Sequence, residues 1–158
     1  MRRLGWILGF MIFMLTPLVS AEQGRYAIIT KVDGQVEVRL FADSAPGAWQ
    51  AAKAGMTLHE KDEIRTGPKS IANLLIDESG KTGQFELKPD SRLRVNTLAL
   101  DAASGDKTTL LDLAIGDVLV HAEKLKGNSK FEVRTPNSTT GVRGTTFLVS
   151  ANPKKAKN

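Results

Sequence analysis

Short runs in which apolar and polar residues alternate recur along most of the chain, a pattern that is typical of half-buried β-strands. In residues 36–40 (VEVRL) the apolar side chains share one face and the charged ones the other. Similar runs occupy residues 27–30, 63–66, 70–77, 84–88, 92–96, 108–113, 118–121, 130–135 and 145–150. Turn-forming residues separate them. We therefore expect an all-β fold, a single compact β-sandwich or β-roll of short, mostly antiparallel strands.

Local signals predict how some of these strands are joined. Asp33-Gly34 lies between two β-branched runs, which predicts a hairpin. A second hairpin is expected at Gly67, between residues 63–66 and residues 70–77. Residues 42–47 are predicted to form a loop, and residues 50–54 have the composition of a single helical turn.

The first 21 residues have the pattern of a secretory signal peptide. Arg2 and Arg3 precede an apolar run from residue 4 to residue 15, and small residues end at Ala21. We expect a signal-peptide helix that is cleaved after Ala21, which places the mature chain in the bacterial periplasm or outside the cell. An uncleaved N-terminal anchor is the alternative; after cleavage no stable membrane span is expected. The predicted organisation is a signal peptide (1–21), a β domain (22–150) and a basic tail (151–158).

Charge and composition narrow the function classes. The chain has 22 basic and 17 acidic residues, a net charge of +5. Loss of Arg2 and Arg3 with the signal peptide leaves 20 against 17, about +3, which together with export argues against nucleic acid as a partner. There is no cysteine, and His59 and His121 are the two histidines. Because no nucleophile, phosphate-loop or metal-ligand motif is present either, we expect no enzymatic activity, no cofactor and no metal.

Three segments carry a resemblance to a known family. They are residues 65–70 (RTGPKS), the step at residues 87–91 (LKPDS) with residues 116–118 (GDV), and above all residues 131–147, which contain FxVxTP followed by VRGTxF. In these motifs the chain resembles the FecR domain family, over roughly residues 24 to 150. The resemblance implies an all-β periplasmic domain, which in the named members relays transporter occupancy to a sigma factor. Because the apolar segment here begins at residue 4, we expect no sigma-binding domain before it.

The candidate interaction residues come from these motifs: Arg65, Thr66, Thr135, Pro136, Arg143, Gly144 and Thr145. Arg143 is either a cationic contact for a partner or a guanidinium that caps carbonyl groups at a bend. Arg65 and Thr66 are either surface contacts or the end of a strand.

Three functions remain open on the sequence. The first is an exported, non-enzymatic FecR-like domain that binds a protein or an envelope polymer through loops and strand edges. The second is a periplasmic sensor component of iron-uptake and sigma-factor signalling. The third is an enzyme acting on envelope carbohydrate, which the absence of a catalytic motif disfavours.

Overall fold

The computed structural model describes residues 24–42, 45–77, 82–142 and 144–152, so the predicted signal peptide and Arg143 lie outside the described residues. Within these ranges all regular secondary structure is β. The strands are β1 (Ala27–Asp33), β2 (Val36–Arg39), β3 (Phe41–Ala42), β4 (Ala45–Pro46), β5 (Gln50–Ala51), β6 (Thr57–Leu58), β7 (Glu63–Thr66), β8 (Ile71–Ile76), β9 (Gly83–Leu87), β10 (Arg92–Leu100), β11 (Lys107–Ala122), β12 (Lys130–Arg134), β13 (Thr139–Val142) and β14 (Thr146–Ala151). The predicted all-β, mostly antiparallel fold is confirmed.

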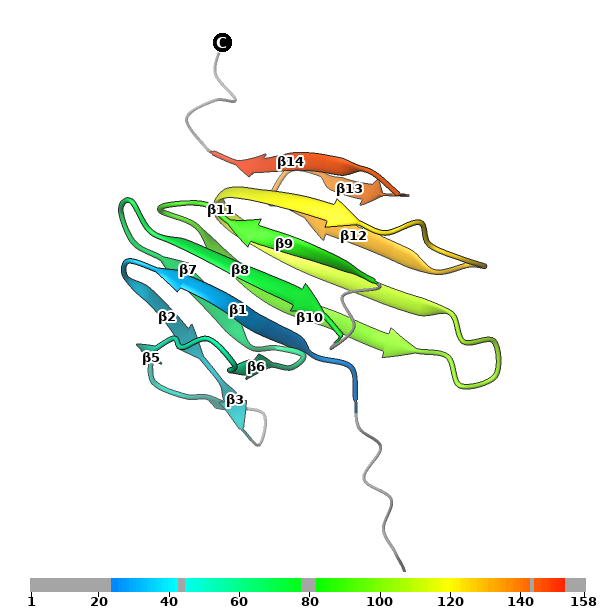
Figure 1. Ribbon diagram of the computed structural model, residues 1–158, viewed down its shortest axis with the longest axis horizontal. Coiled ribbons are helices and arrows are strands. Elements are labelled where there is room, and N and C mark those ends of the chain that lie inside the picture. Colours follow the sequence, from blue (N-terminus) through cyan, green and yellow to red (C-terminus); the bar gives the residue numbers. More distant parts are fainter. Residues whose placement is uncertain (1–23, 43–44, 78–81, 143, 153–158) are drawn as a thin grey trace, which may run out of the picture.

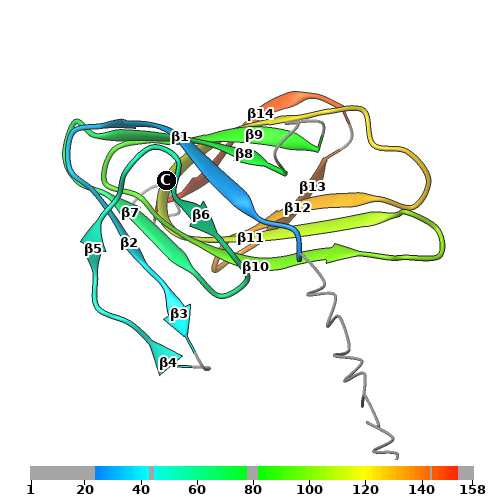
Figure 2. The ribbon, with the colours of Figure 1, turned by 60° about the horizontal axis from the view of Figure 1, so that its bottom comes forward.

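The strands form a strongly curled sheet, shaped like half a barrel, whose two halves enclose the core (Figures 1 and 2). One half, the A layer, contains β6, β1, β8, β9, residues 116–122 of β11, and β14. The other half, the B layer, contains β5, β2, β7, β10, residues 107–115 of β11, β12 and β13. The long strand β11 therefore belongs to both layers.

Alternation along each strand fills the space between the layers. Ile29, Leu74 and Phe85 face inward from the A layer, and Ile64 and Leu111 face inward from the B layer, each at most 2% exposed. Burial of such side chains contributes about 1.5–3 kcal/mol each. The inward positions predicted from the alternation are confirmed, among them Val36, Val38, Ala72, Leu74, Ile76, Leu87, Leu93, Phe131, Val133 and Val149.

Four bends join the layers at one end of the molecule, and each carries a chain from one layer to the other. Two of them, at Gly34 and Gly116, have positive φ angles of 78° and 91°. The other two share the sequence Pro-x-Ser, ending at Ser70 and Ser91. Ser70 Oγ accepts a hydrogen bond from the backbone N–H of Gln35 (2.8 Å), and Ser91 Oγ accepts one from the N–H of residue 117 (2.9 Å).

The two layers repeat one pairing pattern. In the B layer the neighbouring strands are, in order, β2, β7, β10 and the first half of β11. In the A layer the corresponding strands are, in order, the second half of β11, β9, β8 and β1. One copy of the pattern contains the Gly34 bend packed on the bend that ends at Ser70, and the other contains the Gly116 bend packed on the bend that ends at Ser91. The copies run in opposite order along the chain, because the glycine bend comes first in one and last in the other.

The two predicted hairpins are wrong for the same physical reason. β1 pairs with β6 and β8, whereas β2 pairs with β5 and β7, so the chain at Gly34 crosses between layers instead of reversing within one. The chain at Gly67 likewise joins β7 of the B layer to β8 of the A layer. A hairpin and a crossing between layers both have turn-forming residues between two alternating strands. They differ in whether those two strands pair with each other or with other strands.

Three smaller expectations also change. The predicted loop at residues 42–47 includes the short strands β3 and β4, which pair with each other. The predicted helical turn at residues 50–54 begins instead with β5, which pairs with β2. The runs 108–113 and 118–121 belong to the single strand β11, which bends at Gly116 without ending.

Candidate functional site: an uncharged sheet edge

Arg65 and Thr66 are neighbours on β7, but they lie on opposite faces of it. Arg65 is on the outer face of the B layer, where it pairs with Glu37 (2.8 Å) and lies 4.2 Å from the ring centre of Trp49. Thr66 faces inward and is 6% exposed, and its hydroxyl donates to the backbone carbonyl of Lys88 (2.6 Å). Thr66 therefore holds two bends together, and only Arg65 of this pair is accessible to a partner.

The remaining described candidates flank β13. Thr135 and Pro136 lie in the turn between β12 and β13, where the N–H of Thr135 donates to the carbonyl of Ser138 (2.7 Å). Gly144, with a φ of 65°, and Thr145 precede β14, and the Thr145 carbonyl accepts a hydrogen bond from the N–H of Ala122 (3.2 Å). The structure thus divides the motif residues between the two layers and does not gather them into one site.

The longest strand at a sheet edge is β14, among the edges that the described residues form. The A layer ends in β6 and β14, and the B layer ends in β5 and β13. β5 and β6 have two residues each and β13 has four, whereas β14 has six and pairs with β11 on one side alone. Figure 1 shows β14 at the margin of the molecule. The backbone groups along its other side have no strand partner in the described part of the chain.

Side chains do not protect this edge. Residues 144–152 contain no charged residue and no proline, although proteins commonly use charges or proline to prevent edge pairing. Leu148 projects from the outer face of β14 and is 59% exposed. Its partner in register, Leu119 on β11, extends the apolar surface inward along the A layer.

A shallow hollow of about 170 Å³ continues from this edge across the outer face of the A layer. His121, one of its lining residues, is bonded through Nδ1 to the hydroxyl of Thr146 on β14 (2.6 Å). Asn73 also lines it, and its side-chain oxygen is buried with no hydrogen-bond partner in the described residues. The full lining is Thr30, Asn73, Leu74, Gln84, Phe85, Glu86, Leu119 and His121. The lining comes from β1, β8, β9 and β11, so the hollow extends across the outer face of the A layer beside β14.

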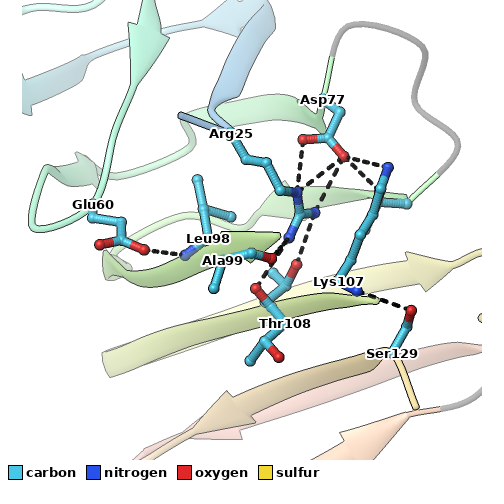
Figure 3. A network of polar contacts seen from close by, with 10 residues as sticks. Arg25, Glu60, Asp77, Leu98, Ala99, Lys107, Thr108 and Ser129 are labelled. Atoms are coloured by element: carbon cyan, nitrogen blue, oxygen red, sulfur yellow. Dashed lines mark hydrogen bonds and ion pairs between the residues drawn. The ribbon is translucent and has the colours of Figure 1, made fainter. Parts of the chain in front are cut away.

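A second polar cluster, the clamp, lies at the end of the molecule opposite the four bends (Figure 3). It consists of Arg25, Asp77, Thr82 and Lys107. The Arg25 guanidinium binds Asp77 (3.0 Å) of the A layer and the carbonyls of Ala99 and Thr108 (both 3.0 Å) of the B layer. Burial raises the pKa of Asp77, but hydrogen bonds from Arg25, Thr82 and Lys107 outweigh it and hold that pKa below its usual range. Because its charged groups pair with one another, the clamp is a structural tie between the layers.

Within the described residues, no group of three or more His, Asp or Glu side chains is placed to hold a metal ion. The same part of the chain contains no helix that is long and apolar enough to cross a membrane.

The strand order and the curled sheet define an all-β domain. Comparison with known families matches residues 62–157 to the FecR family, described as FecR protein. This match covers more than half of the chain, and the chain belongs to the FecR family. No curated protein and no solved structure matches the chain significantly.

Proposed function

We propose that this protein is an exported, non-enzymatic binding module that recognises an extended, uncharged segment of another envelope protein by adding it as a strand beside β14. Strand addition uses backbone hydrogen bonds for affinity and side-chain pockets for specificity. The unprotected six-residue edge of β14 is the observation that carries the proposal. Export is supported by the signal-peptide pattern of residues 1–21.

The chemistry of the edge selects the kind of partner. An incoming strand would lie against residues 146–151, none of which is charged, so a charged strand would lose solvation without gaining an ion pair. Leu148 and Leu119 offer an apolar contact for one outward side chain of the partner. The unpaired Asn73 oxygen, farther along the same face, offers an acceptor for a donor that reaches the hollow.

A matched pair of substitutions tests the proposal. Leu148→Lys puts a charge on the edge, which opposes strand pairing. Leu100→Lys is the control, because Leu100 is 54% exposed and lies at the end of β10 in the B layer. The tagged full chain and both variants are expressed in the native host, and envelope proteins bound to each are compared. Urea unfolding confirms that all three are equally folded.

The proposal expects a protein that the unchanged chain and Leu100→Lys retain and that Leu148→Lys binds about tenfold less, or weaker still. Amide hydrogen exchange on the purified complex should then slow in residues 146–151. Equal retention by Leu148→Lys, or new protection elsewhere, would contradict it. If no other protein is bound and the chain forms a dimer that Leu148→Lys abolishes, the proposed partner is wrong and β14 pairs with a second copy of this chain.

A further inference from the structure

A row of alternating charges crosses the outer face of the B layer. Its members come from five neighbouring strands: Arg39 (β2), Glu63 (β7), Arg94 (β10), Asp112 (β11) and Arg134 (β12). Glu63 binds Arg39 (2.7 Å) and lies 3.5 Å from Arg94, and Asp112 binds Arg134 (2.7 Å). We call this row, together with Glu37, Arg65 and Arg92, the arginine face.

Two aromatic rings hold several of these guanidinium groups in place. Arg39 and Arg65 lie 4.9 Å and 4.2 Å from the ring centre of Trp49, and Arg94 lies 5.0 Å from that of Phe41. A stacked guanidinium keeps its N–H edge available for hydrogen bonds. Part of the entropy of ordering these side chains is therefore lost on folding and not on binding a ligand.

Arg92 differs from the other arginines of this face. It is exposed, and among the described residues its side chain has no hydrogen-bond or ion-pair partner. Its partner in register on β7 is Arg65, so two positive charges lie directly opposite each other. Such a pair is unfavourable in a sheet unless a counter-charge joins it. The carboxylates of Glu37, Glu63 and Asp112 are already occupied by the other four arginines.

Arg92 and Arg94 both line a cavity of about 180 Å³ on this face, together with Glu63, Leu93, Asp112 and Ala114. The two carboxylates of this lining are paired with Arg39 and Arg134, which lie outside it. Ala114 leaves the cavity open, because a bulge in the β10–β11 pairing places this small residue beside Arg92. Arg94 contacts the Lys61 carbonyl and Glu63 through its Nε atom, which leaves its two terminal nitrogens for another acceptor. Two arginines thus border one space that is large enough for a small oxyanion.

The basic residues of these strands favour recognition by the planar guanidinium group of arginine over the point charge of lysine. The chain has thirteen lysines and nine arginines, yet every basic residue of β2, β7 and β10 is an arginine. Guanidinium forks match the oxygens of phosphate and carboxylate. One fork can satisfy both oxygens of a carboxylate, whereas two converging forks fit the larger number of oxygens on a phosphate.

We propose that the cavity between Arg92 and Arg94 binds a phosphate group, with Arg92 as the principal contact. The group is carried either by a lipid or polymer of the envelope or by a soluble phosphate compound. This site is separate from the β14 edge, because it lies on the outer face of the other layer and shares no residue with it.

The test uses inorganic pyrophosphate as the probe, titrated into the isotopically labelled chain while the arginine Nε–H resonances are recorded. Arg92→Ala is compared with Arg134→Ala. Both remove one positive charge from the same face, but Arg134 is engaged by Asp112 through two contacts of 2.7 Å and does not line the cavity. A general attraction to negative charge would therefore weaken equally in both variants.

The proposal expects the Arg92 and Arg94 resonances to shift most. Arg92→Ala should weaken binding about tenfold or more, and Arg134→Ala less than about twofold. Vesicles of phosphatidylcholine with and without phosphatidylglycerol distinguish the sources. The same dependence on Arg92 with the anionic vesicles assigns a lipid-borne phosphate, and binding of pyrophosphate alone assigns a soluble one. Equal losses in the two variants, no shift at Arg92, or equally tight binding of acetate would overturn the proposal.

Discussion

The A and B layers share one pairing pattern and differ almost completely on their outer faces. Both present apolar side chains inward and meet at the same kind of bend. Outward, β2, β7 and β10 of the B layer carry four arginines, whereas β8, β9, the second half of β11 and β14 in the A layer carry none. In both layers the bends and the inward residues follow one pattern, so the difference between the outer faces arises at positions that the core does not constrain.

The largest effect that we expect comes from the glycine bends, where the two copies of the pattern differ. A Cβ atom at Gly116 would lie 2.5 Å from the Cα of Ser91, and one at Gly34 would lie 3.1 Å from the Cα of Ser70. Backbone is harder to move than a side chain, so Gly116→Ala should lower the free energy of unfolding by about 3 kcal/mol or more and Gly34→Ala by less. Urea unfolding of both variants measures the difference. A larger loss for Gly34→Ala would show that the second bend is the more adaptable of the two.

The next effect concerns the clamp, which joins the layers at the opposite end. Because the pKa of Asp77 in the folded protein lies below its usual value, its contribution to stability is present above that usual value and is lost as pH falls through the folded-state pKa. We expect Asp77→Asn to lower the unfolding free energy by about 2–3 kcal/mol at neutral pH, because it leaves Arg25 without its anion.

The pH dependence separates this effect from a simple change of shape. The difference between the unchanged chain and Asp77→Asn should shrink when urea unfolding is repeated below about pH 4. Asp33→Asn, at an exposed position, is the control and should have little effect at either pH. A difference that stays constant as the solution is acidified would show that the Asp77 charge is not what ties the layers.

The smallest expected effects are those of the two bend serines, which should be alike. Ser70 and Ser91 are both buried, and each hydroxyl accepts a hydrogen bond from the backbone N–H of the adjacent glycine bend. Replacement of either by alanine leaves that N–H without its partner and should cost about 1–2 kcal/mol. Urea unfolding of Ser70→Ala and Ser91→Ala measures both values. A severalfold difference between them would mean that the two copies of the pattern are not energetically equivalent.

The sequence predicts the strands well and their partners poorly. Alternation correctly places Val36, Leu74 and Phe131 in the core, because the side-chain period of a strand is local information. The crossing at Gly34 is predicted wrongly as a hairpin, since a glycine with positive φ is needed in both. What distinguishes the crossing is the contact of that glycine bend with Ser70, far along the chain.

The family motifs are informative for the fold but do not locate the candidate surfaces. Thr66 belongs to a motif and is buried. Of the motif candidates that the structure describes, Arg65 alone lies on the arginine face. Its neighbours are Arg92, which lies opposite it in register, and Trp49, over whose ring its guanidinium lies. Both are outside the interaction residues that the motifs indicate, because the folded structure brings them together from separate parts of the chain. The sequence feature that accompanies the β14 edge is the absence of charged residues over residues 144–152. That signal gains meaning when the structure shows that one side of β14 is unpaired.

The most direct test measures the binding activity of both surfaces in the same set of proteins. The unchanged chain, Leu148→Lys and Arg92→Ala are each measured for capture of the envelope protein and for binding of pyrophosphate. We expect Leu148→Lys to lose the protein and keep pyrophosphate, and Arg92→Ala to do the reverse. If either substitution weakens both activities while the fold remains intact, the claim that the two layers carry separate binding functions on a common frame is contradicted.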